Sequence, residues 1–399
     1  MKGPMIRSTH SHDPPTMRMT RYPPLPPFSA LALAMTFACC ADSARAQPSA
    51  SPDWSVLRSG STALLRGVSA ASSRVVWASG AGGTVLRSED GGSTWTARPV
   101  PAERGAKPLD FRDVDAVDDS TAYLLSIGPG AASRIHKTRD GGATWALQHT
   151  NPEPQGFLDA MGFWDADNGL VVGDSIAGHF HILLTNDGGA TWTRVPDSAL
   201  PPALPNEGAF AASGSNIAVV GRDDAWIAMA GRVLHTADRG RSWSVAATPM
   251  ATGDSAGIFS VAFRDRLHGV IVGGDYKQER ATGRNVAHTE DGGKTWVLAD
   301  AQGLSGFRSA VAYLPGAVRT LVAIGPQGAD RSDDDGHTWT PMALPAPQAG
   351  FHAFSFAPAA KAGLQSAWAV GNGGAIARFQ LQSPPQSPPQ SPLQPPAAR

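Results

Sequence analysis

The chain has 399 residues, with 33 basic and 34 acidic side chains and a formal net charge of −1. This even balance, without any basic run, argues against a nucleic-acid-binding protein. Its only two cysteines, Cys39 and Cys40, lie near the N-terminus, so the remainder can form no disulfide and must rely on a large apolar core, for which its length is ample.

The first 46 residues have the pattern of a secretory signal peptide. Arg18 and Arg21 precede a short apolar stretch, residues 28–41, and Ala46 ends a small-x-small cleavage site. We therefore predict a signal peptide over residues 1–46, with translation starting at Met17 or Met19, and an exported protein, periplasmic or extracellular. After its removal the net charge is near −4.

The apolar stretch is too short to span a bilayer, and no later stretch is longer, so we expect no membrane-spanning segment. A lipoprotein signal needs a leucine-like residue upstream of its cysteine. Thr36 and Phe37 stand there instead, which disfavours lipidation of Cys39 or Cys40.

Six near-copies of one eight-residue motif follow along the chain. They are SEDGGSTW (88–95), TRDGGATW (138–145), TNDGGATW (185–192), TADRGRSW (236–243), TEDGGKTW (289–296) and SDDDGHTW (332–339). Successive tryptophans are 50, 47, 51, 53 and 43 residues apart, a period typical of solenoids, propellers and other repeat folds.

Each copy is expected to form a tight β-turn between two strands. Glycine supplies the positive φ that the turn needs, the aspartate accepts hydrogen bonds from the turn, and the tryptophan buries a large apolar area. We therefore expect structural rather than catalytic roles for the motif aspartates, which are Asp90, Asp140, Asp187, Asp238, Asp291 and Asp334.

The segments between the motifs predict four short strands per repeat, the pattern of a propeller blade. The first inner strand comes before residue 75, and six more are expected to begin near Phe111, Phe157, Phe210, Phe259, Phe307 and Phe351. The sequence predicts seven inner strands but contains only six motifs. Because each motif connects a third strand to a fourth strand, the last blade lacks a fourth strand. We predict an all-β fold over residues 47–380: a single seven-bladed β-propeller closed by residues 53–57 pairing with residues 375–379.

Candidate ligand-binding residues come from the face opposite the motif turns, where inner strands start. Arg66, Arg112, Arg308 and His352 occupy matching places in four consecutive blades and are expected to form a basic arc that could bind a carboxylate or phosphate. The alternative is that each arginine pairs with a nearby acid such as Asp113.

The same face is expected to gather acids from other blades, and the loop of residues 274–285 is its longest polar connection. Acids opposite arginines could form a glycosidase-like site or an ordinary charge-balanced rim. These candidates are Asp159, Asp174, Glu207, Asp275 and Tyr276.

No metal or cofactor is expected. His179 and His181 share one face of a strand but have no evident third ligand, and the sequence contains no zinc, nucleotide-loop or nucleophile-elbow motif. Proline recurs every few residues over 381–399, which predicts a disordered Pro/Gln/Ser-rich tail, either inert or a spacer or docking segment.

The motifs match the Asp boxes of sialidase-type (BNR) repeats. With the GGTVLRSEDGGSTW unit, its echo GGAIARF and the recurring inner-strand arginines, the chain resembles the photosystem II assembly and stability factor propellers. That resemblance implies a non-enzymatic scaffold that binds a protein partner, and we expect this chain to be a monomer. The sialidases need an arginine in a Phe-Arg-Ile-Pro context, which is absent here. We therefore expect an exported scaffold for a protein or glycan ligand of the cell envelope, with a glycoside hydrolase or lyase as the alternative.

Overall fold

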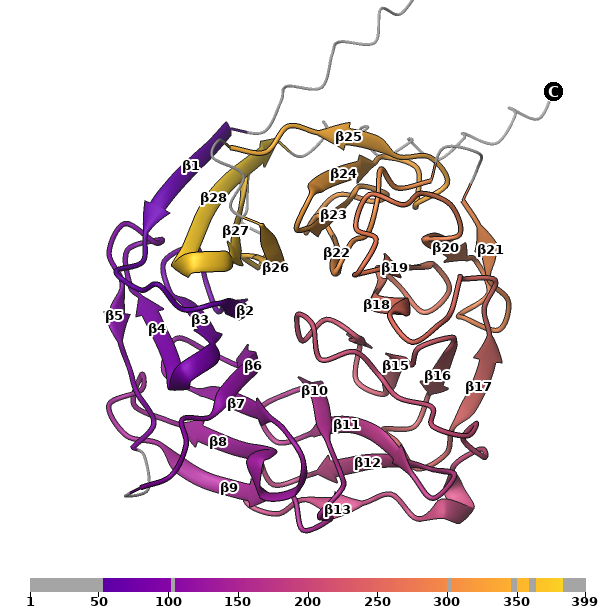
Figure 1. The fold of residues 1–399 in the computed structure, drawn as a ribbon, viewed down its shortest axis with the longest axis horizontal. Helices are drawn as coiled ribbons and strands as arrows, with labels where there is room; N and C mark the ends of the chain where they lie inside the picture. Colours follow the sequence, from indigo (N-terminus) through magenta and orange to yellow (C-terminus); the bar gives the residue numbers. More distant parts are fainter. Residues whose placement is uncertain (1–52, 102–104, 300–302, 346–349, 359–363, 383–399) are drawn as a thin grey trace, which may run out of the picture. The chain divides into compact units, whose positions relative to one another are not determined.

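Seven four-stranded antiparallel sheets make up the described part of the chain and follow one another around a ring (Figure 1). The structure is a computed structural model that describes residues 53–101, 105–299, 303–345, 350–358 and 364–382. The predicted signal peptide and residues 383–399 of the predicted tail lie outside the described residues. No helix in these ranges is long and apolar enough to cross a bilayer.

The inner strands line the centre of the ring, and each contacts the inner strand of the blades on either side. They are β2 (Leu65–Ala70), β6 (Asp110–Ala116), β10 (Leu158–Phe163), β14 (Ile217–Val220), β18 (Ala256–Phe263), β22 (Ala310–Tyr313) and β26 (Phe351–Phe356). The second strands are β3 (Val76–Gly80), β7 (Ala122–Ile127), β11 (Gly169–Ile176), β15 (Asp224–Ala228), β19 (Gly269–Asp275), β23 (Leu321–Gly325) and β27 (Leu364–Gly371).

The two outer strands of each blade flank the motif turn. The third strands are β4 (Thr84–Ser88), β8 (Arg134–Thr138), β12 (His179–Thr185), β16 (Arg232–Thr236), β20 (Val286–Thr289), β24 (Gly328–Ser332) and β28 (Ala375–Gln382). The fourth strands are β5 (Thr96–Ala97), β9 (Ala146–Thr150), β13 (Thr193–Arg194), β17 (Ser244–Ala247), β21 (Val297–Leu298), β25 (Thr340–Met342) and β1 (Asp53–Arg58).

The two ends of the propeller share the seventh blade, as predicted. β1 pairs antiparallel with β28, with Trp54 opposite Phe379 and Leu57 opposite Ile376. The Trp54 ring lies 4.5 Å from the ring of Phe379 and stacks on Phe351. The N-terminal strand therefore supplies the missing fourth strand, covers the edge of β28 and closes the ring.

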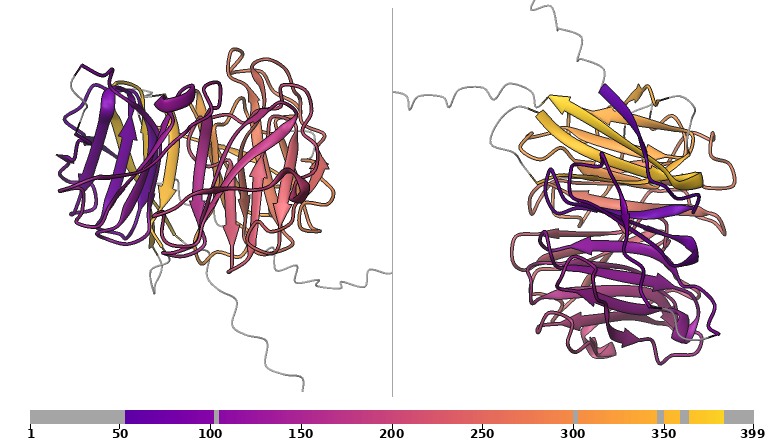
Figure 2. Two further views of the ribbon diagram at one scale, coloured as in Figure 1. Left: turned by 90° about the horizontal axis from the view of Figure 1, so that it is seen from below. Right: turned by 90° about the vertical axis from the view of Figure 1, so that its left-hand side faces the viewer.

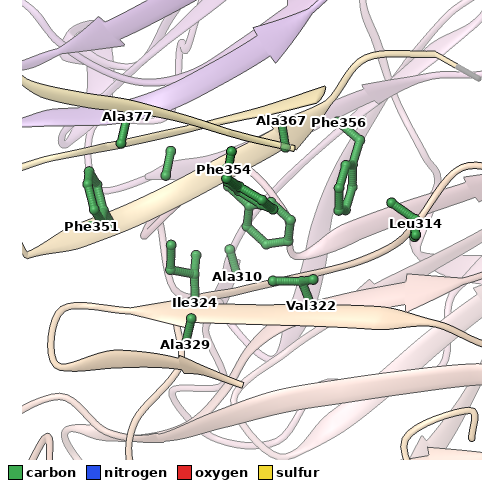
Figure 3. Close-up of a cluster of buried hydrophobic side chains, with 12 residues drawn as sticks. Ala310, Leu314, Val322, Ile324, Ala329, Phe351, Phe354, Phe356, Ala367 and Ala377 are labelled. Carbon is green, nitrogen blue, oxygen red and sulfur yellow. The ribbon is translucent and has the colours of Figure 1, made fainter. Parts of the chain in front are cut away.

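The hydrophobic core lies between neighbouring blades. The cluster between blades six and seven is one example: Val322 and Ile324 of β23 face Phe351 and Phe354 of β26 (Figure 3). Alternate side chains of a strand point to opposite faces, so every blade buries one face against each neighbour. The strands run between the two broad faces of the ring (Figure 2), which leaves those faces to the connecting turns.

Aromatic side chains on three of the second strands bind their blade to the motif turn of the next. The Trp226 indole N–H donates to Gly292 O at 2.8 Å, the Trp368 N–H to Gly91 O at 3.0 Å, and the Tyr123 hydroxyl to Gly188 O at 2.8 Å. These three rings are completely buried. Of the motif tryptophans, Trp296 and Trp339 are buried, and the other four are half-buried and pack against the hydrophobic clusters between blades.

The motif aspartates accept hydrogen bonds from within their own turn, as expected. In the second copy, Asp140 Oδ1 accepts from the Thr138 hydroxyl at 2.8 Å and from the Thr144 N–H at 2.9 Å, while Oδ2 accepts from the Thr144 hydroxyl at 2.6 Å. These bonds lower the pKa of Asp140 to about 2, the Thr144 side-chain bond first. The carboxylate itself is exposed to solvent, not buried.

We expect Asp140→Ala to lower the melting temperature, because the Thr138 and Thr144 hydroxyls and the Thr144 N–H lose their acceptor. Ligand binding should be unchanged, since the turn lies on the face opposite the inner-strand starts. Thermal unfolding of the variant checks this, with Asp140→Asn, which keeps one acceptor oxygen, as the matched control. Equal melting temperatures for wild type and Asp140→Ala would show that Asp140 does not stabilise the turn.

Candidate functional site

Five inner strands carry a register irregularity near their first residue, on the face away from the motif turns. In each of these strands, one residue has no partner in the second strand of the same blade. These residues are Arg66 in β2, Arg112 in β6, Asp159 in β10, Phe259 in β18 and His352 in β26. A β-bulge of this kind bends the strand and redirects the side chain of the extra residue. All five residues line one pocket, of about 480 Å³.

The cationic wall of this pocket comes from blades one, two and seven. Arg112 pairs with Asp110 at 3.1 Å and donates to Ala211 O at 3.1 Å. Arg66 makes no such pair: its Nε is buried and has no hydrogen-bond partner among the described residues. Burial and then the nearby Arg112 lower the pKa of Arg66 to about 10, so it remains charged at neutral pH.

His352 is an uncharged member of the same wall. Its Nε2 lies 3.0 Å from Asn372 Oδ1. Burial, and then the neighbouring Arg66, lower its pKa to about 4. The expected basic arc therefore consists of two arginines with a neutral histidine beside them.

The acidic wall contains Asp159, Asp174 and Glu279. Asp159 is only 2% exposed, and its Oδ2 has no hydrogen-bond partner in the described part of the chain. Asp174 Oδ1 accepts from Ala209 N–H at 3.2 Å. Burial, and secondly the nearby Asp174, raise the pKa of Asp159 well above its usual range.

Aromatic rings form the third wall. Phe210 stacks on Phe259 with ring centroids 4.0 Å apart, Phe307 meets Phe259 edge-on at 4.6 Å, and Tyr276 lies edge-on to both Phe210 and Phe259. Tyr276 is 43% exposed, so the cluster reaches from the interior to the surface. This wall can bury an apolar side chain of a ligand.

The segment before β14, residues 209–216, crosses the central channel below the pocket. Ala211 O accepts from Arg112 of blade two, Ser215 O accepts from Val261 N–H of blade five at 3.0 Å, and Ser213 donates to Ser309 O of blade six at 2.8 Å. In Figure 1 the connection from β13 to β14 reaches into the middle of the ring. Because residues 209–212 line the pocket, they form its floor.

This segment corrects the prediction that an inner strand begins near Phe210: β14 begins at Ile217. Gly214 has φ of +71°, and a Cβ there would lie 2.1 Å from Asp113 Oδ1. Glycine thus permits a turn pressed against blade two, and the hydrogen bonds to blades two, five and six hold the segment across the channel rather than in a strand.

Arg308 does not belong to the pocket, contrary to the prediction. It precedes β22 without a bulge, is 1% exposed, and its Nε donates to Asp330 at 2.7 Å. Its other nitrogens donate to Ser305 and to Phe307 O. With every donor group engaged inside the protein, Arg308 serves to fix the loop before β22, which is the pairing that the sequence left open as an alternative.

Glu207 and Asp275 also lie outside the pocket lining. Glu207 is buried against Arg232, whose Nε donates to it at 2.8 Å. Asp275 accepts from the Lys277 N–H at 2.9 Å and from the Gln278 amide, which shapes its own loop. The pocket therefore contains six of the predicted residues, namely Arg66, Arg112, Asp159, Asp174, Tyr276 and His352.

Sequence reasoning missed Glu279 and the phenylalanines of the aromatic wall as site residues, although it included Tyr276. Phenylalanines were recognised as strand starts, and their recurrence at the same place in several repeats was the available signal for an aromatic lining. Glu279 lies in the long loop of residues 274–285 that the sequence marked as functional. Glu279 and Arg66 both line the pocket, and the Glu279 charge opposes the lowering of the Arg66 pKa by burial.

We expect Asp159→Asn to stabilise the protein at neutral pH and not in acid. The folded-state pKa of Asp159 is raised, so its contribution to stability is complete below the unfolded value of about 3.9 and is lost as pH rises through the folded pKa. Melting temperatures of wild type and variant between pH 4 and 8 check this. The variant should gain stability over wild type as pH rises, and a constant difference would contradict it.

Comparison with known proteins places this fold among two groups of propellers. Residues 108–253 match the family model for the photosynthesis system II assembly factor YCF48. The photosystem II assembly lipoprotein Ycf48 of Synechococcus sp. (strain CC9902) is 28% identical over 257 residues, which cover 63% of this chain and 67% of that protein. The predicted resemblance to the photosystem II assembly factor propellers is thus confirmed.

Two further similar proteins have different functions: one is described as bound to a peptide, and the other is a xyloglucanase. A solved structure described as YCF48 bound to D1 peptide superposes with a TM-score of 0.58 at 16% identity, over 82% of this chain and 96% of that one. A xyloglucanase of Paenibacillus sp. is 28% identical over 159 residues, 33% of this chain but only 15% of the enzyme.

Proposed function

Given that the chain is similar to the Ycf48 propellers in sequence and fold, we propose that it is a binding scaffold that holds a segment of a partner protein in the bulge-lined pocket. The observation that carries this proposal is the pocket itself: bulges on consecutive inner strands bring Arg66 and Arg112 into one cavity beside an aromatic wall. The relative described as bound to D1 peptide supports a peptide as the ligand.

The dimensions and chemistry of the pocket suit a short segment of chain. Its volume of about 480 Å³ lies within the range of small-ligand sites and admits a few side chains, not a folded domain. Arg66 has an unpartnered donor that can meet a carboxylate, and the rings of Phe259 and Tyr276 can bury an apolar side chain. The predicted signal peptide supports a partner in the cell envelope.

Fluorescence anisotropy with labelled nine-residue peptides tests the proposal. The peptides carry one aromatic residue and end in either a free carboxylate or an amide. Free-carboxylate peptides should bind about tenfold or more tightly than the amides, since a charge-assisted hydrogen bond contributes about 1.5–3 kcal/mol. Binding by none of the peptides, with capture of sugars on a glycan array instead, would overturn the peptide-binding function.

A glycoside hydrolase is the second candidate, because two carboxyl groups, Asp159 and Asp174, share the pocket and the raised pKa of Asp159 is what a general acid requires. The similarity to a xyloglucanase supports the same assignment. Release of reducing ends from xyloglucan oligosaccharides, lost in Asp159→Asn and in Asp174→Asn, would favour the enzyme. Absence of turnover by the wild type would exclude it for that substrate.

A further inference from the structure

The acidic wall of the pocket contains a buried oxygen that nothing in the described chain satisfies. The Asp159 side chain is 2% exposed, lines the pocket, and its Oδ2 has no hydrogen-bond partner. A buried polar atom without a partner destabilises the folded state, and more so when the group is charged. The bulge in β10 keeps this side chain at the channel mouth rather than within the sheet.

A second carboxyl group lies beside the first. Asp174, at the β11 end of the same blade, lines the same pocket as Asp159. Asp174 uses one oxygen to accept from Ala209 N–H, and Gly208 allows this approach, because a Cβ there would lie 2.2 Å from Asp174 Oδ1. The pocket floor therefore holds Asp174 in place next to an unsatisfied Asp159.

The cations of the pocket do not neutralise this pair. Arg112 is engaged by Asp110 and Ala211 O, and Arg66 lies among Arg112, Asp110 and Glu279. Neither arginine makes a salt bridge to Asp159 or Asp174 among the described residues. The two acids thus form an acidic subsite that is not paired with the arginines of the same pocket.

We infer that Asp159 and Asp174 form a subsite for a protonated primary amine, the end of a lysine side chain or a chain N-terminus, carried by the bound segment. An ammonium group offers three N–H donors and a positive charge, which meets both the missing hydrogen bond and the unbalanced charge. A quaternary ammonium lacks the donors. The described residues contain no group of three or more potential metal ligands, so an organic cation fits better than a metal ion.

Together with the arginines and the aromatic wall, this subsite defines the class of segment that the pocket accepts. Such a segment presents an amine, a carboxylate and an apolar side chain. It rests on the proposed function only for the nature of the ligand. The amine subsite itself can be measured with a small probe.

The probe is n-butylammonium chloride, added to the full chain while the melting temperature is recorded, with tetramethylammonium chloride and sodium chloride at equal ionic strength for comparison. Butylammonium should raise the melting temperature of the wild type saturably, and tetramethylammonium should not. The apparent dissociation constant should weaken about tenfold or more in Asp159→Asn and in Asp174→Asn. Asp115→Asn, which removes another inner-strand carboxyl outside the pocket lining, should respond as the wild type does.

A wild type without a saturable response would overturn the inference. So would equal responses in wild type and both pocket variants, or an equal effect of tetramethylammonium. The second variant keeps the test decisive if one substitution disturbs folding.

Peptides then separate this inference from the proposed function. Among the nine-residue peptides, replacing a single lysine by norleucine should weaken binding about tenfold at one position, and Asp159→Asn should abolish that preference. If butylammonium binds through Asp159 but no peptide binds, the amine subsite stands and the peptide-binding scaffold fails. If peptides bind with no lysine preference and butylammonium has no effect, the scaffold stands and the amine subsite fails.

Discussion

Trp226→Ala is expected to lower the free energy of unfolding by about 3–5 kcal/mol, the range found when a large aromatic side chain is removed from a core. Trp226 is completely buried between blades four and five, stacked on Phe263 at 3.7 Å and on His235 at 4.5 Å. Its N–H also donates to Gly292 O in the next motif turn. The substitution thus leaves a cavity and an unsatisfied carbonyl at one blade interface. Urea unfolding at neutral pH measures the loss.

Two matched variants show whether this depth of burial is responsible. Trp226→Phe keeps an aromatic ring and loses the hydrogen bond to Gly292, so it should cost clearly less. Trp95→Ala removes a motif tryptophan that is only half-buried and should also cost less. If Trp95→Ala were as damaging as Trp226→Ala, the motif tryptophans rather than the second-strand rings would dominate the contact between blades.

The double substitution Arg66→Gln/Arg112→Gln is expected to weaken peptide binding about 100-fold or more, with a smaller loss of melting temperature because Arg112 also pairs with Asp110 and donates to Ala211 O. Each charge-assisted hydrogen bond to a ligand carboxylate contributes about 1.5–3 kcal/mol, and 1.4 kcal/mol corresponds to a tenfold change in affinity. Both side chains are partly exposed at the pocket, so their removal leaves no cavity in the core. Fluorescence anisotropy measures the affinity.

Arg74→Gln is the control, because Arg74 is exposed beside the motif turn of the first blade, on the opposite face. Wild-type binding should also weaken with added salt, since exposed charges are screened beyond roughly 8 Å at physiological ionic strength. Unchanged affinity in the double variant, or an equal loss in Arg74→Gln, would show that the pocket arginines do not hold the ligand.

The candidate site could be predicted from the sequence wherever the repeats align without insertion. Arg66, Arg112 and His352 follow the start of regular inner strands, so their common place in the repeat translated into a common place at the pocket. Arg308 occupies the same place in the alignment, yet β22 starts two residues later and the side chain turns inward to Asp330. One-dimensional spacing does not distinguish an arginine at a bulge from one that is paired inside the protein.

Local chemistry accounts for what the sequence determined by itself: the number of blades, their order and the closure of the ring. Each motif combines at least one glycine that adopts positive φ with an aspartate that accepts hydrogen bonds within the same turn, so its conformation depends on residues a few positions apart. The count of seven inner strands against six motifs then required the N-terminal strand, with Trp54, to complete the last blade.

Contacts between residues far apart in the chain were decided by the tertiary structure alone. The segment of residues 209–216 closes the channel because its hydrogen-bond partners lie on blades two, five and six, about 50 to 100 residues away. The same holds for the neutral state of His352, which depends on burial and on the charges of Arg66 and Arg112 from other blades, and for the unsatisfied oxygen of Asp159, which depends on burial. Burial and proximity are properties of the closed ring, and no repeat specifies them on its own.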